Sequence, residues 1–255
     1  MRRELIALLL LTSAVAMLAE TSGKCSIATG QSNEKLSFNW GRGDCADGDH
    51  CHEGSTDNMP WSRWTGIEPQ DLQHEGASVD ARRRAEAGEI RCMGTVHEGV
   101  LRGTYSFTPD LQFAKAMESL GFDGQTPDRL EGYAMLDVTT EWVKGLKDEH
   151  VAGMTAQNLM GLRALKVDGA YVHGMAVAGY PELHAEKLTG MKAVGVSPEK
   201  VQAVCAMGYS PTQEELIQMS VFKIDAPFVQ RMKERGFKNL TIAQLVKIKV
   251  FKLDE

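Results

Sequence analysis

The sequence lacks an excess of basic residues, and after its first nineteen residues it lacks any long apolar run. Lys and Arg number 28 against 34 Asp and Glu, which gives a formal net charge of −6. A protein that binds nucleic-acid backbones needs clustered positive charge, so nucleic acid is not an expected partner. No later segment reaches the roughly 20 apolar residues of a membrane helix, so the mature chain is expected to have no stable membrane span.

Motifs that carry catalysis are also absent. The chain has no Gly-x-Ser-x-Gly nucleophile elbow, no phosphate-binding loop and no dinucleotide fingerprint. His-Glu-Gly triplets begin at His52, His74 and His97, but none has the second histidine four positions on that a zinc-binding helix requires. We therefore expect turns or loops at these triplets, no cofactor and no enzyme. A hydrolase built from dispersed His, Asp and Ser residues is the least favoured hypothesis.

The composition is that of a folded protein. Of its 255 residues, 43% are hydrophobic and 24% are charged. These values are typical of globular domains rather than of a disordered chain. The length allows one large domain or two modest ones.

The first nineteen residues have the pattern of a secretory signal peptide. Arg2 and Arg3 precede the apolar run Leu5–Leu18, and small residues up to Ala19 offer cleavage points. We therefore predict that the segment 1–19 is removed on export to the periplasm or to the extracellular space. An uncleaved membrane anchor is the alternative, because the two arginines do not decide cleavage.

Five cysteines need an explanation in an oxidising compartment. Four of them lie early in the chain and allow three pairings, among which the sequence cannot choose. A bond between Cys45 and Cys51 would close a small loop and is preferred, which leaves Cys25 for Cys92. Cys205 stands alone downstream and is expected to be partly accessible and unpaired within the chain. It is either a tolerated free thiol or the link of a covalent dimer.

The segment from Cys45 to Glu53 also suggests a metal-binding or thiol-redox protein, which we keep as the alternative function. Cysteine, histidine and carboxylate side chains are crowded there, and Cys45, His50, Cys51 and His52 are the candidate metal ligands. Their spacing matches neither a standard zinc motif nor a calcium loop. A disulfide-tied or solvated loop is therefore favoured.

The segment 20–106 is expected to form an antiparallel β module, because the hydrophobic period between Lys35 and Phe107 is two, which indicates β-strands. We predict a small antiparallel β-meander with one polar face. Within it, the Cys-, Asp- and Gly-rich stretch 41–58 is expected to be an excursion loop. The expected strands cover residues 36–40, 79–85, 90–96 and 101–107.

Two tryptophans follow this loop. A sheet of this size needs a cover on its apolar face, because a few strands alone are not stable. Trp61 and Trp64 are three residues apart and are interaction candidates as a ligand-stacking pair. The alternative is that they fill the open face of the sheet.

The second half of the chain repeats with a period of about 29 residues. Val138, Val167, Val196, Ile224 and Leu253 begin segments that are 29, 29, 28 and 29 residues apart. Apolar residues recur within each segment at steps of three, which are helical steps, and each segment has two such stretches. The expected unit is therefore a helical hairpin.

Helix start and stop signals support the hairpins. Thr212 followed by Glu215 is a capping-box arrangement. Gly208 should end the preceding helix, because glycine accepts the left-handed conformation. The first helix of the series is expected to open at Thr108-Pro109.

A single hairpin cannot bury its apolar stripe, so neighbouring hairpins must stack. We predict an α+β fold in which residues 107–255 form an α-hairpin solenoid of about five 29-residue repeats. The outer side of the last hairpin has no partner in this scheme. Val246, Val250 and Phe251 are therefore candidates for an exposed apolar edge that binds a partner or a second copy, unless the chain termini cover it.

Two stretches of this array, Val196–Tyr209 and Phe237–Val250, resemble an uncharacterised bacterial repeat of exported proteins. A similar repeat follows the membrane part of some BlaR-like sensor metallopeptidases. The stretches Trp61–Leu72 and Gly103–Pro109 are similar to the β-region that often precedes that repeat. The resemblance covers most of the mature chain and implies a cell-envelope module that detects or recruits something. It carries no catalytic residues, because the peptidase helix with its zinc ligands has no counterpart here.

The sequence thus predicts a non-enzymatic interaction or scaffold module of the bacterial cell envelope. Stacked hairpins present an extended surface, and nothing else in the chain offers chemistry. The expected partner is a protein of the envelope. Self-association through the last repeat or through Cys205 is a second expectation.

Overall fold

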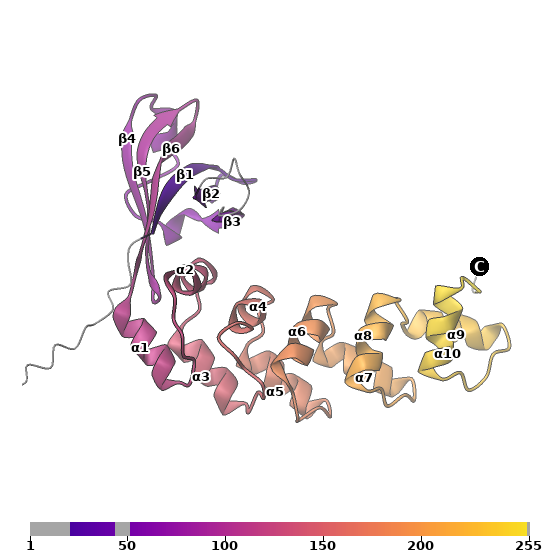
Figure 1. Cartoon of the computed structure of the whole chain (residues 1–255). Coiled ribbons are helices and arrows are strands. Elements are labelled where there is room, and N and C mark those ends of the chain that lie inside the picture. Colours follow the sequence, from indigo (N-terminus) through magenta and orange to yellow (C-terminus); the bar gives the residue numbers. More distant parts are fainter. Residues whose placement is uncertain (1–20, 44–51, 254–255) are drawn as a thin grey trace, which may run out of the picture.

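The structure is a computed structural model, and it describes residues 21–43 and 52–253. The described part has an α+β fold, in which a six-stranded antiparallel sheet precedes ten α-helices (Figure 1). No described helix is both long enough and apolar enough to cross a membrane. Outside the described residues lie the predicted signal segment 1–19 and three of the candidate metal ligands, Cys45, His50 and Cys51.

Six strands form the sheet: β1 (Thr21–Thr29), β2 (Lys35–Arg42), β3 (His52–Pro60), β4 (Ser78–Ala85), β5 (Gly88–His97) and β6 (Val100–Pro109). Their spatial order is β3-β2-β1-β6-β5-β4, and all neighbours are antiparallel. The sheet is therefore two three-stranded meanders joined along β1 and β6, rather than the single meander expected.

All four expected strands are present, as β2, β4, β5 and β6, whereas β1 and β3 were not anticipated. The prediction that 41–58 is an excursion loop is wrong over the part that β3 occupies. None of the residues of β3 is buried, so the strand has no alternation of buried and exposed apolar side chains. Backbone pairing with β2 defines it instead.

The sheet bends sharply where β1, β6 and β5 lie next to one another. Cys25 on β1 is bonded to Cys92 on β5 with a Cα–Cα distance of 5.9 Å, although β6 lies between these strands. In a flat sheet such strands would be roughly 10 Å apart. Gly94 and Gly103, which pair between β5 and β6, permit this bend, because a Cβ on either would lie within 2.1 Å of a backbone oxygen of the other strand. The expected Cys25–Cys92 disulfide is thus present.

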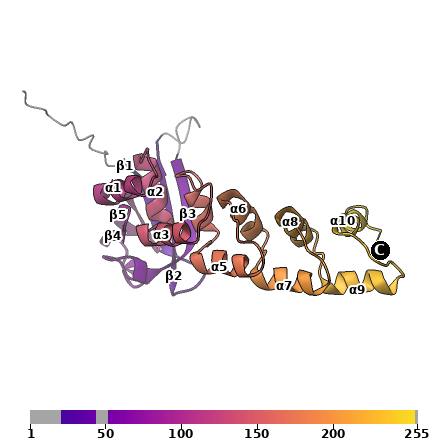
Figure 2. The same cartoon turned by 90° about the horizontal axis from the view of Figure 1, so that it is seen from below.

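Ten α-helices follow the sheet: α1 (Leu111–Ser119), α2 (Pro127–Leu136), α3 (Thr140–Asp148), α4 (Leu159–Ala164), α5 (Gly169–Val177), α6 (Ala185–Ala193), α7 (Pro198–Ala206), α8 (Gln213–Val221), α9 (Ala226–Glu234) and α10 (Ile242–Val250). Odd-numbered helices contact one another in the series α1, α3, α5 and α7, and even-numbered helices from α2 to α10 do the same. Figure 2 shows α5, α7 and α9 in line along one side and α6, α8 and α10 along the other. We call α1–α10 the helical array.

The ends of these helices follow the sequence signals. Thr212 and Glu215 form the expected capping box of α8. Gly208 follows α7 with a positive φ of 90°, a backbone conformation that glycine adopts readily. The expected start at Thr108-Pro109 is wrong, since Pro109 ends β6 and Asp110 caps α1 by accepting hydrogen bonds from the next backbone amides.

The sheet packs on the beginning of the helical array. Helix α2 contacts β4, β5 and β6. The segment between β3 and β4, with two short 3₁₀ helices at Trp61–Arg63 and Asp71–Gln73, adds apolar side chains to the same core. The far end of the array, with α9 and α10, lies away from the sheet (Figure 1).

Candidate interaction surface on the last helix pair

Four residues that follow even-numbered helices share one backbone contact but differ in exposure. Each donates its N–H to the carbonyl five residues earlier, and they are Val167, Val196, Ile224 and Leu253. Val167, Val196 and Ile224 are at most 4% exposed. Leu253, which is 29 positions after Ile224, is 62% exposed. The helix pair that covers each earlier residue has no counterpart over Leu253 within the described part of the chain.

Phe251 is uncovered in the same way. Its counterpart in the preceding helix pair, Phe222, is half-buried and packs against the core, whereas Phe251 is 67% exposed. Val250 is 50% exposed, but its counterpart Val221 in the preceding helix pair is 53% exposed, so this position is open in both helix pairs. Val246 is half-buried against the core. Of the three residues expected at the apolar edge, Phe251 is therefore the one that the last helix pair specifically uncovers.

Two equivalent tyrosines each donate a hydrogen bond to the helix pair that follows, and the last pair has no such tyrosine. The Tyr180 hydroxyl donates to the Pro211 carbonyl, and the Tyr209 hydroxyl donates to the Leu240 carbonyl at 3.0 Å. The equivalent residue in the last pair is Phe237, which has no hydroxyl and is 44% exposed.

The last helix pair is also strongly basic. Residues 224–252 contain seven Lys and Arg but only two Asp and Glu, in a chain whose net charge is −6. Several of these cations are exposed on and around α9 and α10. We define the C-terminal surface as the exposed side chains of Lys233, Phe237, Lys238, Lys247, Phe251, Lys252 and Leu253.

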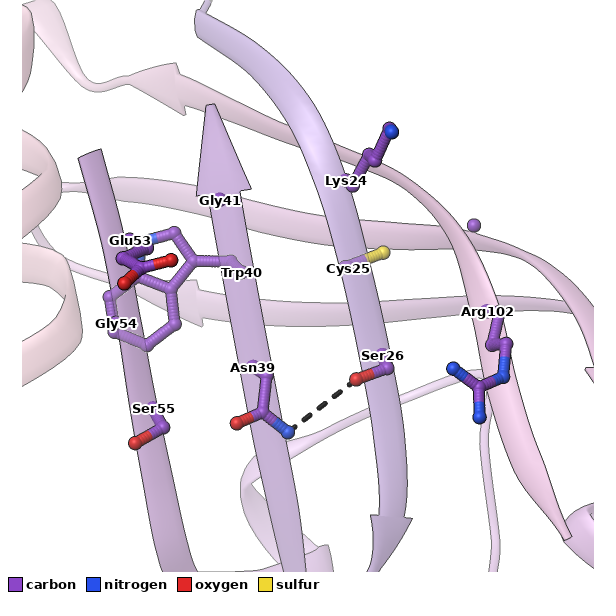
Figure 3. A pocket seen from close by; sticks show the side chains of 11 residues that line it. Lys24, Cys25, Ser26, Asn39, Trp40, Gly41, Glu53, Gly54, Ser55 and Arg102 are labelled. Atoms are coloured by element: carbon purple, nitrogen blue, oxygen red, sulfur yellow. Dashed lines mark hydrogen bonds between the residues drawn. The ribbon is translucent and has the colours of Figure 1, made fainter. Parts of the chain in front are cut away.

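A wide hollow of about 880 Å³ lies at the other end of the molecule, on β1, β2, β3 and β6. Figure 3 shows its lining, in which the Trp40 ring lies beside polar side chains and the Asn39 amide donates to the Ser26 hydroxyl at 3.4 Å. Lys24, Arg102 and Glu53 are among its charged lining residues.

Of the four candidate metal ligands, the structure describes His52. Cys45, His50 and Cys51 lie outside the described residues, and His52 is an exposed residue at the start of β3. Within the described residues, no three His, Cys, Asp or Glu side chains are grouped so that they could hold a metal ion.

Trp61 and Trp64 belong to the core. They are 9% and 5% exposed, and the Trp64 ring packs edge-on against Phe38 at a centroid distance of 4.9 Å. The indole N–H of Trp61 donates to the Asn33 carbonyl at 3.1 Å. This is the packing role that the sequence offered as the alternative to ligand stacking.

A buried polar cluster joins α2 to the sheet. The Tyr105 hydroxyl donates to Glu131 at 2.7 Å, and Arg42 pairs with the same carboxylate at 2.9 Å and with Asp128 at 2.7 Å. Burial, and then the Glu131 charge, raise the pKa of Tyr105 well above its usual value, so its hydroxyl stays protonated and donating. We assign this cluster to the junction between sheet and helices.

Arginine side chains hold the C-terminal end of α2. The Arg83 guanidinium is 3% exposed and donates to the Ala134 carbonyl at 2.8 Å. Arg63 pairs with Asp137 at 2.5 Å, and Arg163 donates to the Asp137 carbonyl at 3.0 Å. Burial lowers the pKa of Arg83. Cations at a helix C-terminus stabilise it, so this group also has a structural role.

Cys205 is exposed and is the free cysteine of the described residues. The prediction that it is accessible and unpaired within the chain is therefore confirmed. Whether it links two chains stays a prediction.

No family model, no curated protein and no solved structure matches this chain. The resemblance to the envelope repeat therefore stays a hypothesis that rests on the residues quoted for it. Function has to be argued from the surface of the molecule.

Proposed function

We propose that this chain is an exported, non-enzymatic interaction or scaffold module of the cell envelope, and that its C-terminal surface binds an acidic protein partner. The observation that carries the proposal is the exposure of Phe251 and Leu253 among clustered lysines. Exposed apolar side chains flanked by charge are typical of protein interfaces. The surrounding cations favour a negatively charged partner, since complementary charge speeds association and excludes wrong partners.

In this proposal the helical array is an α-hairpin solenoid of about five repeats. The support comes from contacts between next-but-one helices, which run from α1 to α7 in the odd series and from α2 to α10 in the even series, so that neighbouring hairpins pack on one another. Side-chain hydrogen bonds such as Tyr209 to Leu240 connect residues 31 positions apart, which is about one repeat. A solenoid separates the junction with the sheet from the C-terminal surface, which suits a scaffold.

Site-specific photocrosslinking in living cells tests the proposed surface. A photoreactive phenylalanine analogue would replace Phe251 in one variant and Val177 in a second, because Val177 is similarly exposed at the end of α5 in the middle of the array. We expect position 251 to yield a discrete adduct with one envelope protein that has an acidic surface, and position 177 to yield none. Equal adducts from both positions, or no adduct from position 251, would contradict the proposal.

Charge reversal provides the second arm of this test. The pair Lys247→Glu and Lys252→Glu should reduce the adduct at position 251 at least tenfold, because it replaces attraction by repulsion. Lys115→Glu with Lys144→Glu is the matched control, since both lysines are exposed on the early helices of the array. An adduct between two copies of this chain would show that the surface serves self-association, and it would contradict the acidic partner.

A further inference from the structure

Three aromatic side chains of the helical array each lie under a cation from the following helix. The aromatic residue is on an odd-numbered helix, and the cation is 21 positions later on the next even-numbered helix. The pairs are Trp142 with Arg163 at 5.4 Å, Tyr171 with Lys192 at 4.0 Å, and Phe228 with Lys249 at 4.3 Å, measured from the cation to the ring centroid.

Two of these rings also donate a hydrogen bond to the next helix pair. The indole N–H of Trp142 donates to the Val167 carbonyl at 2.8 Å, and the Tyr171 hydroxyl donates to the Val196 carbonyl at 3.0 Å. Val167 and Val196 are equivalent residues, each the first of its 29-residue segment. The ring therefore fills the gap between two helix pairs, and its polar hydrogen satisfies a carbonyl on the far side of that gap.

The helix pair α7 and α8 lacks both the aromatic ring and the cation at the equivalent positions. Lys200 stands where Trp142, Tyr171 and Phe228 would place a ring, and Ser220 stands where the cation would be. Lys200 is exposed, and its ammonium lies 3.5 Å from where a Cβ on Gly195 would be.

A hollow of about 310 Å³ lies at this position, between α7, α8 and the start of α9. Lys200 and Ser220 both line it, and most of its remaining wall is apolar. Ile224, the residue equivalent to Val167 and Val196, is part of the wall. The apolar wall residues include Val196, Val204, Leu216, Met219 and Ile224.

We propose that this hollow, the Lys200 pocket, binds an aromatic group that carries an N–H or O–H donor, that is, an indole or a phenol. The ring would take the place that Trp142 and Tyr171 take in their own helix pairs, and its donor would meet the Ile224 carbonyl. The apolar wall favours the ring, and the Lys200 ammonium adds a cation beside it. The proposal is independent of the partner of the C-terminal surface.

Calorimetry with indole and 4-methylphenol tests the pocket on the full mature chain. We expect both probes to bind with one site per chain and a Kd near or below about 1 mM, as suits ligands of this size. Toluene, which has no donor, should bind at least several-fold more weakly. N-acetyl-tyrosinamide and N-acetyl-tryptophanamide are measured in the same way, because they mimic side chains attached to a peptide backbone. If they bind, the pocket can accept a protein side chain; if only the free probes bind, its ligand is a small molecule.

Three variants locate the binding. Lys200→Tyr restores the residue type found at 171, so it should fill the pocket, weaken binding at least tenfold and raise the Tm. Gln202→Tyr adds a tyrosine to the exposed face of the same helix and should leave binding unchanged. Lys200→Gln keeps the pocket open and should still bind. The proposal is overturned if the wild-type chain binds neither probe, or if Lys200→Tyr binds them as the wild type does.

Discussion

Glu131 is a buried carboxylate on α2 that two groups of the sheet hold in place. Its side chain is 6% exposed, and its partners are the Tyr105 hydroxyl and Arg42. Removing one member of a buried pair leaves the other charge without compensation, which is more costly than losing an exposed pair. The local environment therefore makes Glu131 far more sensitive to substitution than its neighbour Asp128, although both pair with Arg42.

We predict that Glu131→Leu lowers the free energy of unfolding by about 3 kcal/mol, because Tyr105 is left without its acceptor and Arg42 keeps only the exposed Asp128 as a partner. Asp128→Asn is the control, since the Asp128 side chain is 54% exposed and its pair with Arg42 should contribute at most about 1 kcal/mol. Urea denaturation followed by circular dichroism measures both variants. Similar losses for the two would show that burial does not set the strength of this cluster.

Two glycines of the structure have opposite roles, and both roles follow from the elements that contain them. Gly103 lies on β6 where a Cβ would meet a backbone oxygen of β5 at 2.1 Å, so the strand bends only without a side chain there. Gly145 lies within α3, where a Cβ would have no neighbouring atom within 4 Å. The first glycine is required by a close approach, and the second only weakens its helix.

We predict that Gly103→Ala destabilises the protein by about 2–3 kcal/mol, since a backbone strand has to move. Gly145→Ala should stabilise it by about 0.5–1 kcal/mol, because alanine has the higher helix propensity. The two Tm values, measured by the same thermal scan, should shift in opposite directions. A neutral Gly103→Ala variant would mean that the sheet is not bent at this strand.

Helices with strong local signals were predictable, and strands without them were not. The capping box at Thr212 and the helix end at Gly208 lie where the sequence placed them, because caps depend on nearby residues. Strand β3 depends on backbone pairing with β2 and packs Met59 alone against the core, so its residues have no hydrophobic period to detect. The bend at Gly103 depends on contacts between distant strands, which a single sequence does not display.

The candidate surface was predictable in part for the same reason. Phe251 was expected at the exposed edge because the repeat places it on the last helix pair, and it is exposed. The sequence did not single out Leu253. The exposure of Leu253 becomes significant only by comparison with equivalent residues such as Ile224, which are buried. Lys200 is visible in the sequence as a lysine among aromatic equivalents, but the significance of that column comes from the ring contacts.

At the scale of the whole molecule, charge and exposed apolar area are unevenly distributed. The chain is acidic overall, yet its last helix pair is basic and carries Phe251 and Leu253 on its surface. The sheet at the other end is tied by a disulfide and packs on α2. This uneven distribution suits a scaffold that binds its partner through the last helix pair. We predict that binding there weakens as the salt concentration rises, because salt screens the lysine charges.

The last helix pair exposes Phe251 and Leu253, whereas their equivalents in the preceding pair are half-buried or buried. Hydroxyl-radical footprinting of the mature protein, read by mass spectrometry, measures this directly. We predict strong oxidation of Phe251 and Leu253 and protection of their equivalents Phe222 and Ile224. Protection of all four residues in the isolated protein, or equal oxidation of all four, would contradict the account.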